Sequence, residues 1–168
     1  MSKHKEITFE TEIIQYLTRY DWIEGTSDGY DQALALYPED LINYIKSTQP
    51  KEYEKFQKRH QGNTDAALCK HVASQLDKQG SLYYLRHELK EINARFKLCQ
   101  FKPDLYSKPL MEKYDKNILR VVRQVYYSEH NKNSIDLVLF LNGIPLATIE
   151  LKTDFTQNIQ DAINQYKP

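Results

Sequence analysis

The strongest constraint on the fold is a pair of apolar segments joined by only two residues. Residues 135–141 and 144–151 are rich in Ile, Leu, Val and Phe, and Asn142 and Gly143 separate them. Asn-Gly favours a two-residue hairpin turn, because both turn positions need a positive φ. So short a connection allows only antiparallel pairing. The sequence therefore predicts a β-hairpin over residues 135–151.

The hydrophobic period of the rest of the chain changes near residue 94. Before this point apolar residues recur at helical spacing, and after it alternation and β-branched residues indicate strands. The predicted helices cover 8–17, a segment starting at Pro38, 51–60, 64–79, 82–92 and, after the hairpin, 156–166. The predicted strands are 95–101 and 118–127, with a loop at 102–117.

We therefore expect an α/β fold, with a mixed β-sheet whose central hairpin is flanked by helices and which follows a helical N-terminal part. The 168 residues fit a single domain, with the helical part over about 1–92 and a sheet-bearing core over about 93–168.

Composition excludes several classes of protein. Hydrophobic residues make up 40% and charged residues 27% of the chain, as in folded domains rather than disordered tails. The two cysteines, Cys69 and Cys99, exclude a disulfide framework and a four-cysteine zinc site. The charged N-terminus is unlike a secretory signal, and no apolar stretch approaches membrane-spanning length. We expect a cytoplasmic protein with no membrane partner.

The formal net charge is zero, but the charges are unevenly distributed. Residues 6–54 carry 11 acidic and three basic side chains, whereas residues 82–133 carry 11 basic and six acidic ones. A basic segment in a neutral chain can face phosphates, because binding depends on local charge. The alternative is a set of ordinary solvated faces.

Three charged residues interrupt the apolar hairpin. Asp136 lies in its first strand, and Glu150 and Lys152 lie two residues apart near the end of the second, so they share a face. Charges in nearly buried strands are costly unless they are paired or bound to metal. Mg²⁺ prefers one or two carboxylates with waters and phosphate oxygens. A lysine beside it can hold an attacking water.

The hairpin register tests this idea. An unbroken ladder from a two-residue turn would pair Asp136 with Ile149 and put Asp136 and Glu150 on opposite faces. Both can bind one metal only if the connection has three residues, including Ile144, or if a bulge intervenes. We therefore predict such a connection or bulge, with Asp136 opposite Glu150.

These blocks resemble a known family. The nuclease signature of type I restriction enzyme R subunits, a version of the PD-(D/E)-x-K motif, is similar to Asn133-Ser134-Ile135-Asp136, Asn142-Gly143-Ile144-Pro145 and Ile149-Glu150-Leu151-Lys152. Ile135-Asp136 stands where the motif name has Pro-Asp. Residues 9–17, 30–40 and 48–50 also resemble that family's N-terminal region, so the resemblance covers nearly the whole chain and implies a restriction-endonuclease-like fold.

The resemblance implies roles for four residues. Asp136 and Glu150 would bind Mg²⁺, and Lys152 would assist the water nucleophile. Glu10 would be the acidic residue that the first helix of many such nucleases contributes near the metal. The alternatives are an exposed ion pair between Glu150 and Lys152, and a solvated helix face at Glu10.

Further residues are candidates for DNA contact. Many family members carry a glutamine four residues before a tyrosine in the helix after the lysine, but Tyr166 here has Ala162 at that position. We assign DNA contact to Gln165 and Tyr166, and sequence-independent phosphate contacts to Arg120 and Arg123. A basic strand edge that discourages aggregation is the alternative for the two arginines.

The resemblance implies a function and partners. It indicates an Mg²⁺-dependent endonuclease that cuts double-stranded DNA without reading its sequence, in a complex with methylation and specificity subunits. The chain has no Gly-x-x-x-x-Gly-Lys-Ser/Thr loop, so we expect a fragment of a larger polypeptide whose ATP-using motor lies elsewhere. The alternatives are a non-catalytic docking or DNA-binding domain of the same complex, and another PD-(D/E)-x-K enzyme such as a repair nuclease.

Overall fold

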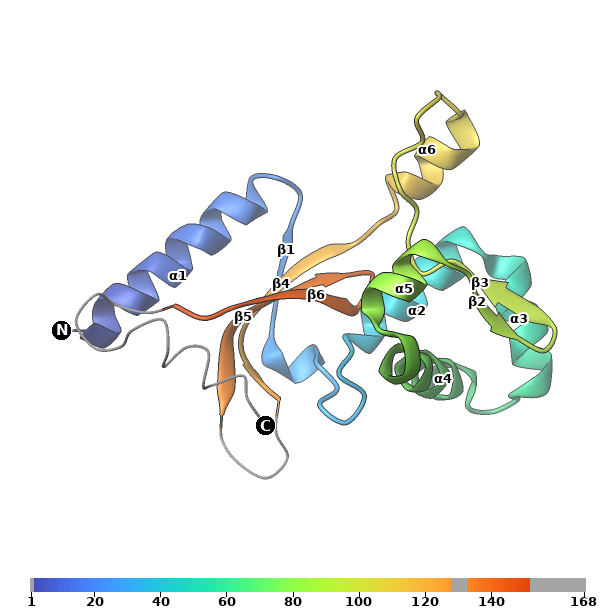
Figure 1. Ribbon diagram of the computed structural model, residues 1–168, viewed down its shortest axis with the longest axis horizontal. Coiled ribbons are helices and arrows are strands. Elements are labelled where there is room, and N and C mark those ends of the chain that lie inside the picture. Colours follow the sequence, from blue (N-terminus) through green and yellow to red (C-terminus); the bar gives the residue numbers. More distant parts are fainter. Residues whose placement is uncertain (1, 128–132, 152–168) are drawn as a thin grey trace.

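A computed structural model describes residues 2–127 and 133–151 and contains a mixed four-stranded sheet (Figure 1). Its strands, in spatial order, are β1 (Ile23–Gly25), β4 (Leu119–Tyr126), β5 (Ser134–Leu141) and β6 (Ile144–Ile149). β1 runs parallel to β4, and the other neighbours are antiparallel. The predicted mixed sheet with its hairpin is confirmed. The sequence did not predict β1.

The middle of the chain forms a helical part around the largest hydrophobic core. Its elements are α2 (Pro38–Thr48), α3 (Pro50–Arg59), α4 (Thr64–Gln79), α5 (Ser81–Arg86), β2 (Leu89–Glu91) and β3 (Ala94–Phe96). Proline occupies the first turn of α2 and of α3, where its missing N–H costs nothing. Gly80, at φ +83°, ends α4. The predicted helices in these three segments are confirmed.

Other boundaries were predicted wrongly. The helix expected over 82–92 ends at Arg86, and the strand expected over 95–101 ends at Phe96. Between them β2 and β3 form a small antiparallel hairpin whose Leu89 and Phe96 are fully buried. Strands of three residues are too short to show a period, so only packing against the helices reveals them.

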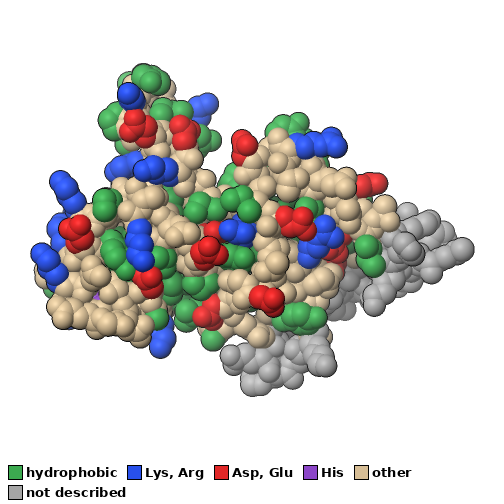
Figure 2. Space-filling view, turned by 180° about the vertical axis from the view of Figure 1, so that it is seen from behind, with side chains coloured by type: hydrophobic (Ala, Val, Ile, Leu, Met, Phe, Trp, Pro, Cys, Tyr) green, Lys and Arg blue, Asp and Glu red, His purple; other side chains and the backbone are tan. Residues whose placement is uncertain are grey.

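Two further helices differ from expectation. α1 (Ser2–Thr18) starts before the expected position near Thr8. The loop predicted at 102–117 contains α6 (Lys108–Tyr114), none of whose residues is buried. Figure 2 shows this segment as a protrusion from the body, with basic and acidic side chains interspersed over the face. None of the helices in residues 2–127 and 133–151 combines the length and apolarity needed to span a bilayer.

The sheet has a hydrophobic cluster on each face. On one face, Ile14 of α1 packs with Val121 and Leu137, and we call this the α1 face. On the opposite face, Tyr37 packs with Val122, Val125, Val138 and Phe140. Although α1 comes first in the chain, it therefore lies on the sheet, apart from the helices α2 to α5 (Figure 1).

The turn of the β5–β6 hairpin joins the sheet to the helical part. Asn142 and Gly143 adopt φ values of +51° and +79°, as a two-residue hairpin turn requires. The carbonyl of Gly143 accepts a 2.8 Å hydrogen bond from the backbone N–H of Tyr37. A Cβ at position 143 would lie 2.3 Å from the Tyr37 carbonyl oxygen, so only glycine allows this contact. The turn thereby fixes the orientation of the hairpin.

Candidate carboxylate site

The hairpin has the bulge that the carboxylate pairing requires. Next to the turn, Leu141 pairs with Ile144 and Phe140 pairs with Pro145. The register then shifts by one residue, because Leu139 pairs with Ala147 and not with Leu146. The predicted bulge is confirmed, and it leaves Leu146 as the extra residue.

Beyond the bulge the new register leads to the predicted acidic pair. The last ladder partners are Leu137 and Ile149, so one further step sets Asp136 across from Glu150. The Asp136 carboxylate accepts a 2.7 Å hydrogen bond from the backbone N–H of Leu151. This bond holds the end of β6 against β5 at the position of Asp136. Both acidic residues are half-buried.

Glu10 of α1 lies in the same region, on the α1 face of the sheet. Its side chain is buried, with 7% exposure, so the alternative of a solvated helix face is wrong. Burial raises the pKa of the Glu10 carboxyl above its usual value, and the negative charge of Asp136 raises it further. Gln124 and Arg123 oppose that shift by interacting with the carboxylate. The carboxyl groups of Glu10 and Asp136 thus approach each other where they are partly shielded from solvent.

A glutamine connects the two carboxylates. The Gln124 side-chain amide donates to Asp136 Oδ1 at 3.2 Å and to Glu10 Oε2 at 3.5 Å. Its oxygen accepts a 2.9 Å hydrogen bond from the Ser134 hydroxyl. Sequence reasoning missed Gln124, because it is one of three polar residues in its strand, beside Arg120 and Arg123, and no motif distinguishes it.

The two arginines predicted to contact phosphate differ in their surroundings. Arg123 is one-third exposed beside the cluster, where its Nε lies 3.0 Å from Glu24 and 3.7 Å from Glu10. The Arg120 side chain is only 13% exposed and forms a two-bond ion pair with Asp40, at 2.6 and 2.8 Å. Its guanidinium also covers the Tyr37 ring. Arg120 therefore stabilises a largely buried ion pair, and the proposed site does not include it.

The chemistry of these donors fits a hard divalent cation. The carboxylates of Glu10 and Asp136, which share the Gln124 amide, repel each other, and Mg²⁺ accepts one or two carboxylates and completes its shell with water. Within residues 2–127 and 133–151, however, no three His, Cys, Asp or Glu side chains converge closely enough to enclose a metal. Lys152, Gln165 and Tyr166 lie outside the described residues, so their predicted roles stay predictions.

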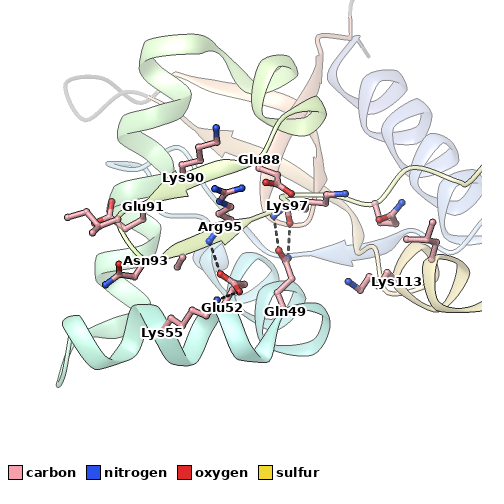
Figure 3. A pocket seen from close by; sticks show the side chains of 14 residues that line it. Gln49, Glu52, Lys55, Glu88, Lys90, Glu91, Asn93, Arg95, Lys97 and Lys113 are labelled. Atoms are coloured by element: carbon pink, nitrogen blue, oxygen red, sulfur yellow. Dashed lines mark hydrogen bonds and ion pairs between the residues drawn. The ribbon is translucent and has the colours of Figure 1, made fainter.

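A separate concave surface lies in the helical part. It encloses about 720 Å³ between α3, the β2–β3 hairpin and α6, and none of the predicted site residues lines it (Figure 3). Gln49 and Glu52 of the α2–α3 segment bond to the backbone of Lys97 and Arg95 at its wall (Figure 3). We call this surface the helical-part groove.

Comparison with known proteins supplies one strong match. The family model described as "Type I restriction enzyme R protein N terminus" matches residues 5–168. No curated protein and no solved structure matches the chain significantly.

Proposed function

We propose, on the premise that this chain belongs to the family of type I restriction enzyme R protein N-terminal domains, that it is the nuclease domain of such an enzyme. The family sets the chain in the context of a restriction–modification complex. The observation that carries the nuclease proposal is the bulged register, which sets Asp136 across from Glu150, together with buried Glu10, whose carboxylate shares the Gln124 amide with Asp136. The activity proposed is Mg²⁺-dependent hydrolysis of phosphodiesters in double-stranded DNA, without sequence readout.

Each residue has a distinct part in this proposal. Asp136 and Glu150 hold the ion, and Glu10 supplies a further negative charge next to it. Lys152 positions the attacking water and stabilises charge that develops on the phosphate. Arg123, at the rim of the cluster, contacts a neighbouring phosphate. Bound Mg²⁺ would polarise a phosphate oxygen and favour deprotonation of a water.

The wider context is also part of the proposal. A sheet whose bulged hairpin carries acidic residues, covered by a first helix that adds another, supports a restriction-endonuclease-like fold. The proposed partners are double-stranded DNA and the methylation and specificity subunits, and the proposed location is the cytoplasm. ATP would be used by motor domains of the R subunit.

The test is cleavage of plasmid DNA by the complete R subunit assembled with its partners, in the presence of Mg²⁺ and ATP. We expect Asp136→Ala and Lys152→Ala to reduce cleavage by more than about 100-fold, as loss of a charge-stabilising group does in other enzymes. ATP hydrolysis should persist and reports intact assembly. Glu112→Ala on α6 is the matched acidic control and should cut normally. Undiminished cleavage by both site variants would refute the proposal.

A second candidate function, a docking domain that binds nucleic acid without cutting it, is supported by the helical-part groove. Lys90, Lys97 and Lys113 line the groove, and none of the three forms an ion pair with a described residue, whereas the charge of Arg95 interacts with Glu52. Glu52, Glu88 and Glu91 lie among them, so the surface is mixed in charge. Unpaired cations around a concave surface suit phosphate groups.

Duplex binding in EDTA separates the two candidates. If the domain docks on nucleic acid through the groove, replacing Lys90 and Lys113 with Gln weakens duplex binding at low salt. The slope of log affinity against log salt concentration then falls by about two phosphate contacts. Lys58→Gln, an exposed lysine of α3 outside the groove, is the control. Unchanged binding in the groove variants removes the docking candidate.

A further inference from the structure

The alternation of side chains along β4 breaks at Gln124. Val122 packs on the opposite face of the sheet and Arg123 reaches Glu10 on the α1 face, as alternation requires. The next residue, Gln124, also reaches Glu10, and Val125 returns to the opposite face. Two consecutive side chains therefore point to the same side of the sheet.

The alternation of side chains along the neighbouring strand β5 also breaks, at Asp136, which lies across from Gln124. Leu137 packs on the α1 face, so Asp136 should point to the opposite face and Ile135 to the α1 face. Instead Ile135 packs in the opposite cluster, and Asp136 bonds to the amide of Gln124. The ladder pairs Arg123 with Leu137 and Val125 with Ile135, with no pair between them. In both strands the alternation of side chains is thus reversed at the same position. As a result, Gln124 and Asp136 point towards Glu10.

The backbone at this position is strained. Gln124 has φ +46°, a left-handed conformation that costs a residue with a Cβ about 1–2 kcal/mol. Strain of this kind persists where the surroundings compensate for it, and it gathers at functional positions. Here the compensation is visible, because the amide obtains two carboxylate acceptors and one hydroxyl donor.

The two carboxylates fix the orientation of the amide. Ionised carboxylates only accept hydrogen bonds, so the NH₂ group faces Glu10 and Asp136, and the Gln124 oxygen accepts from the Ser134 hydroxyl. An NH₂ group carries partial positive charge and has two hydrogens to donate. It therefore relieves the repulsion between Glu10 and Asp136 at the point where their oxygens approach.

We propose that the side-chain amide of Gln124 takes, in the metal-free chain, the place between Glu10 and Asp136 that a divalent cation occupies when bound. Gln124 is then a positioning residue, which keeps the two carboxylates directed at one point and yields to the cation. This inference rests on the proposed function, because it assumes that the carboxylates bind a metal.

The proposal predicts an unusual direction of effect. Gln124→Met keeps the length of the side chain and removes its donors, so it destabilises only the metal-free state. Metal binding should therefore become tighter, by about tenfold or more, because loss of the 3.2 Å bond to Asp136 alone corresponds to about tenfold. Gln124→Glu adds a third carboxylate and should tighten binding further. A purely structural role would weaken both states equally and leave the affinity unchanged.

The experiment is calorimetric titration of the whole 168-residue chain with Mn²⁺, together with thermal unfolding in EDTA and at saturating Mn²⁺. For Gln124→Met we expect tighter binding, a Tm in EDTA lower by about 2–4 °C, and a wild-type Tm with metal. Gln57→Met, on the exposed side of α3, is the control and should match the wild type throughout. Ser134→Ala, which removes the hydrogen bond to the Gln124 oxygen, should show a smaller shift in the same direction.

The possible results separate this inference from the proposed function. Binding by the wild type, with equal or weaker binding by Gln124→Met, overturns the role of Gln124 and leaves the metal site standing. Absence of binding by the wild type and by Gln124→Glu overturns both. Tighter binding by Gln124→Met, with a Tm loss confined to EDTA, supports both.

Discussion

Asn142 shows how one buried polar side chain can fix a turn. It has no solvent exposure, and its side chain bonds to the Leu98 carbonyl, the Asn117 side chain and the Ile118 N–H, at 2.7–2.9 Å. Leu98 follows β3 of the helical part, whereas Asn117 and Ile118 lie between α6 and β4. The residue therefore combines the turn conformation with the attachment of the hairpin.

We predict that Asn142→Ala lowers the free energy of unfolding by about 3 kcal/mol, because it leaves buried polar groups unpaired and keeps a positive φ. Urea unfolding followed by circular dichroism measures this loss. Asn43→Ala, at an exposed position of α2, is the control and should change stability by less than about 0.5 kcal/mol. A loss of that small size at Asn142 would contradict the structural role given to the turn.

Arg120 and Asp40 form a buried pair that joins β4 to α2. Asp40 is 2% exposed, so Arg120→Ala leaves a buried carboxylate without its partner and should cost about 3–5 kcal/mol. Adding Asp40→Ala should recover part of that loss. The alternative DNA-contact role predicts near-normal stability of Arg120→Ala and a clear loss of DNA affinity. Thermal unfolding and DNA binding of the same variants distinguish the two.

The cysteines give a pH-dependent prediction. Burial raises the pKa of the Cys69 and Cys99 thiols to about 11. Both thiols stay protonated in the folded chain at pH 8, so alkylation by iodoacetamide should be slow until urea unfolds the protein. Because the folded pKa is raised, the stability that they contribute is complete below the unfolded pKa and falls as pH rises towards 11. Fast alkylation at pH 8 without urea would show that the thiols are exposed.

At the scale of elements, the bulge in β6 sets the relation between the two acidic residues. Deleting Leu146 removes the extra residue but keeps Ala147 opposite Leu139, so Asp136 still faces Glu150. Deleting both Leu146 and Ala147 shifts the strand by one position and moves Glu150 opposite Leu137.

We therefore expect the single deletion to retain Mn²⁺ binding and the double deletion to lose it. Circular dichroism must first confirm that both variants fold, and calorimetry then measures the affinity. Equal affinities in the two folded variants would mean that the register of β6 does not place the metal ligands.

Local signals in the sequence predicted the hairpin and most helices. The Asn142-Gly143 turn, Pro38 at the start of α2 and Gly80 at the end of α4 each act through their own backbone conformation, so the sequence alone reveals them. The bulge was predicted from the hypothesis that Asp136 and Glu150 share a face, and the register shift between Leu139 and Phe140 confirms the bulge.

The features that the sequence did not reveal depend on packing between residues far apart in the chain. β1 has three residues and pairs with a strand almost 100 positions later, and no local period encodes that contact. Glu10 is buried because α1 lies on the sheet, and the left-handed backbone of Gln124 lies where the β4–β5 ladder lacks a pair. Arg120 looked like a strand-edge cation, because its partner Asp40 lies in another part of the chain.

At the scale of the whole molecule, the helical part and the sheet have separate hydrophobic cores and carry different candidate surfaces. The helical part holds the largest core and carries the groove lined by Lys90, Lys97 and Lys113. The sheet, with α1 on one face, carries the carboxylates, and the buried turn at Asn142 connects the two. The hydrogen bonds of Asn142 therefore attach the sheet that carries Asp136 and Glu150 to the chain that follows the helical part.

The measurement that tests the central claim most directly is anomalous X-ray scattering from crystals of this chain grown with Mn²⁺ in place of Mg²⁺. We predict a peak beside β5 and β6, with carboxylate oxygens of Asp136 and Glu150 at about 2.1 Å from the ion. A map at saturating Mn²⁺ with no peak there, and with Asp136 still bonded only to Gln124 and the Leu151 N–H, would contradict the account.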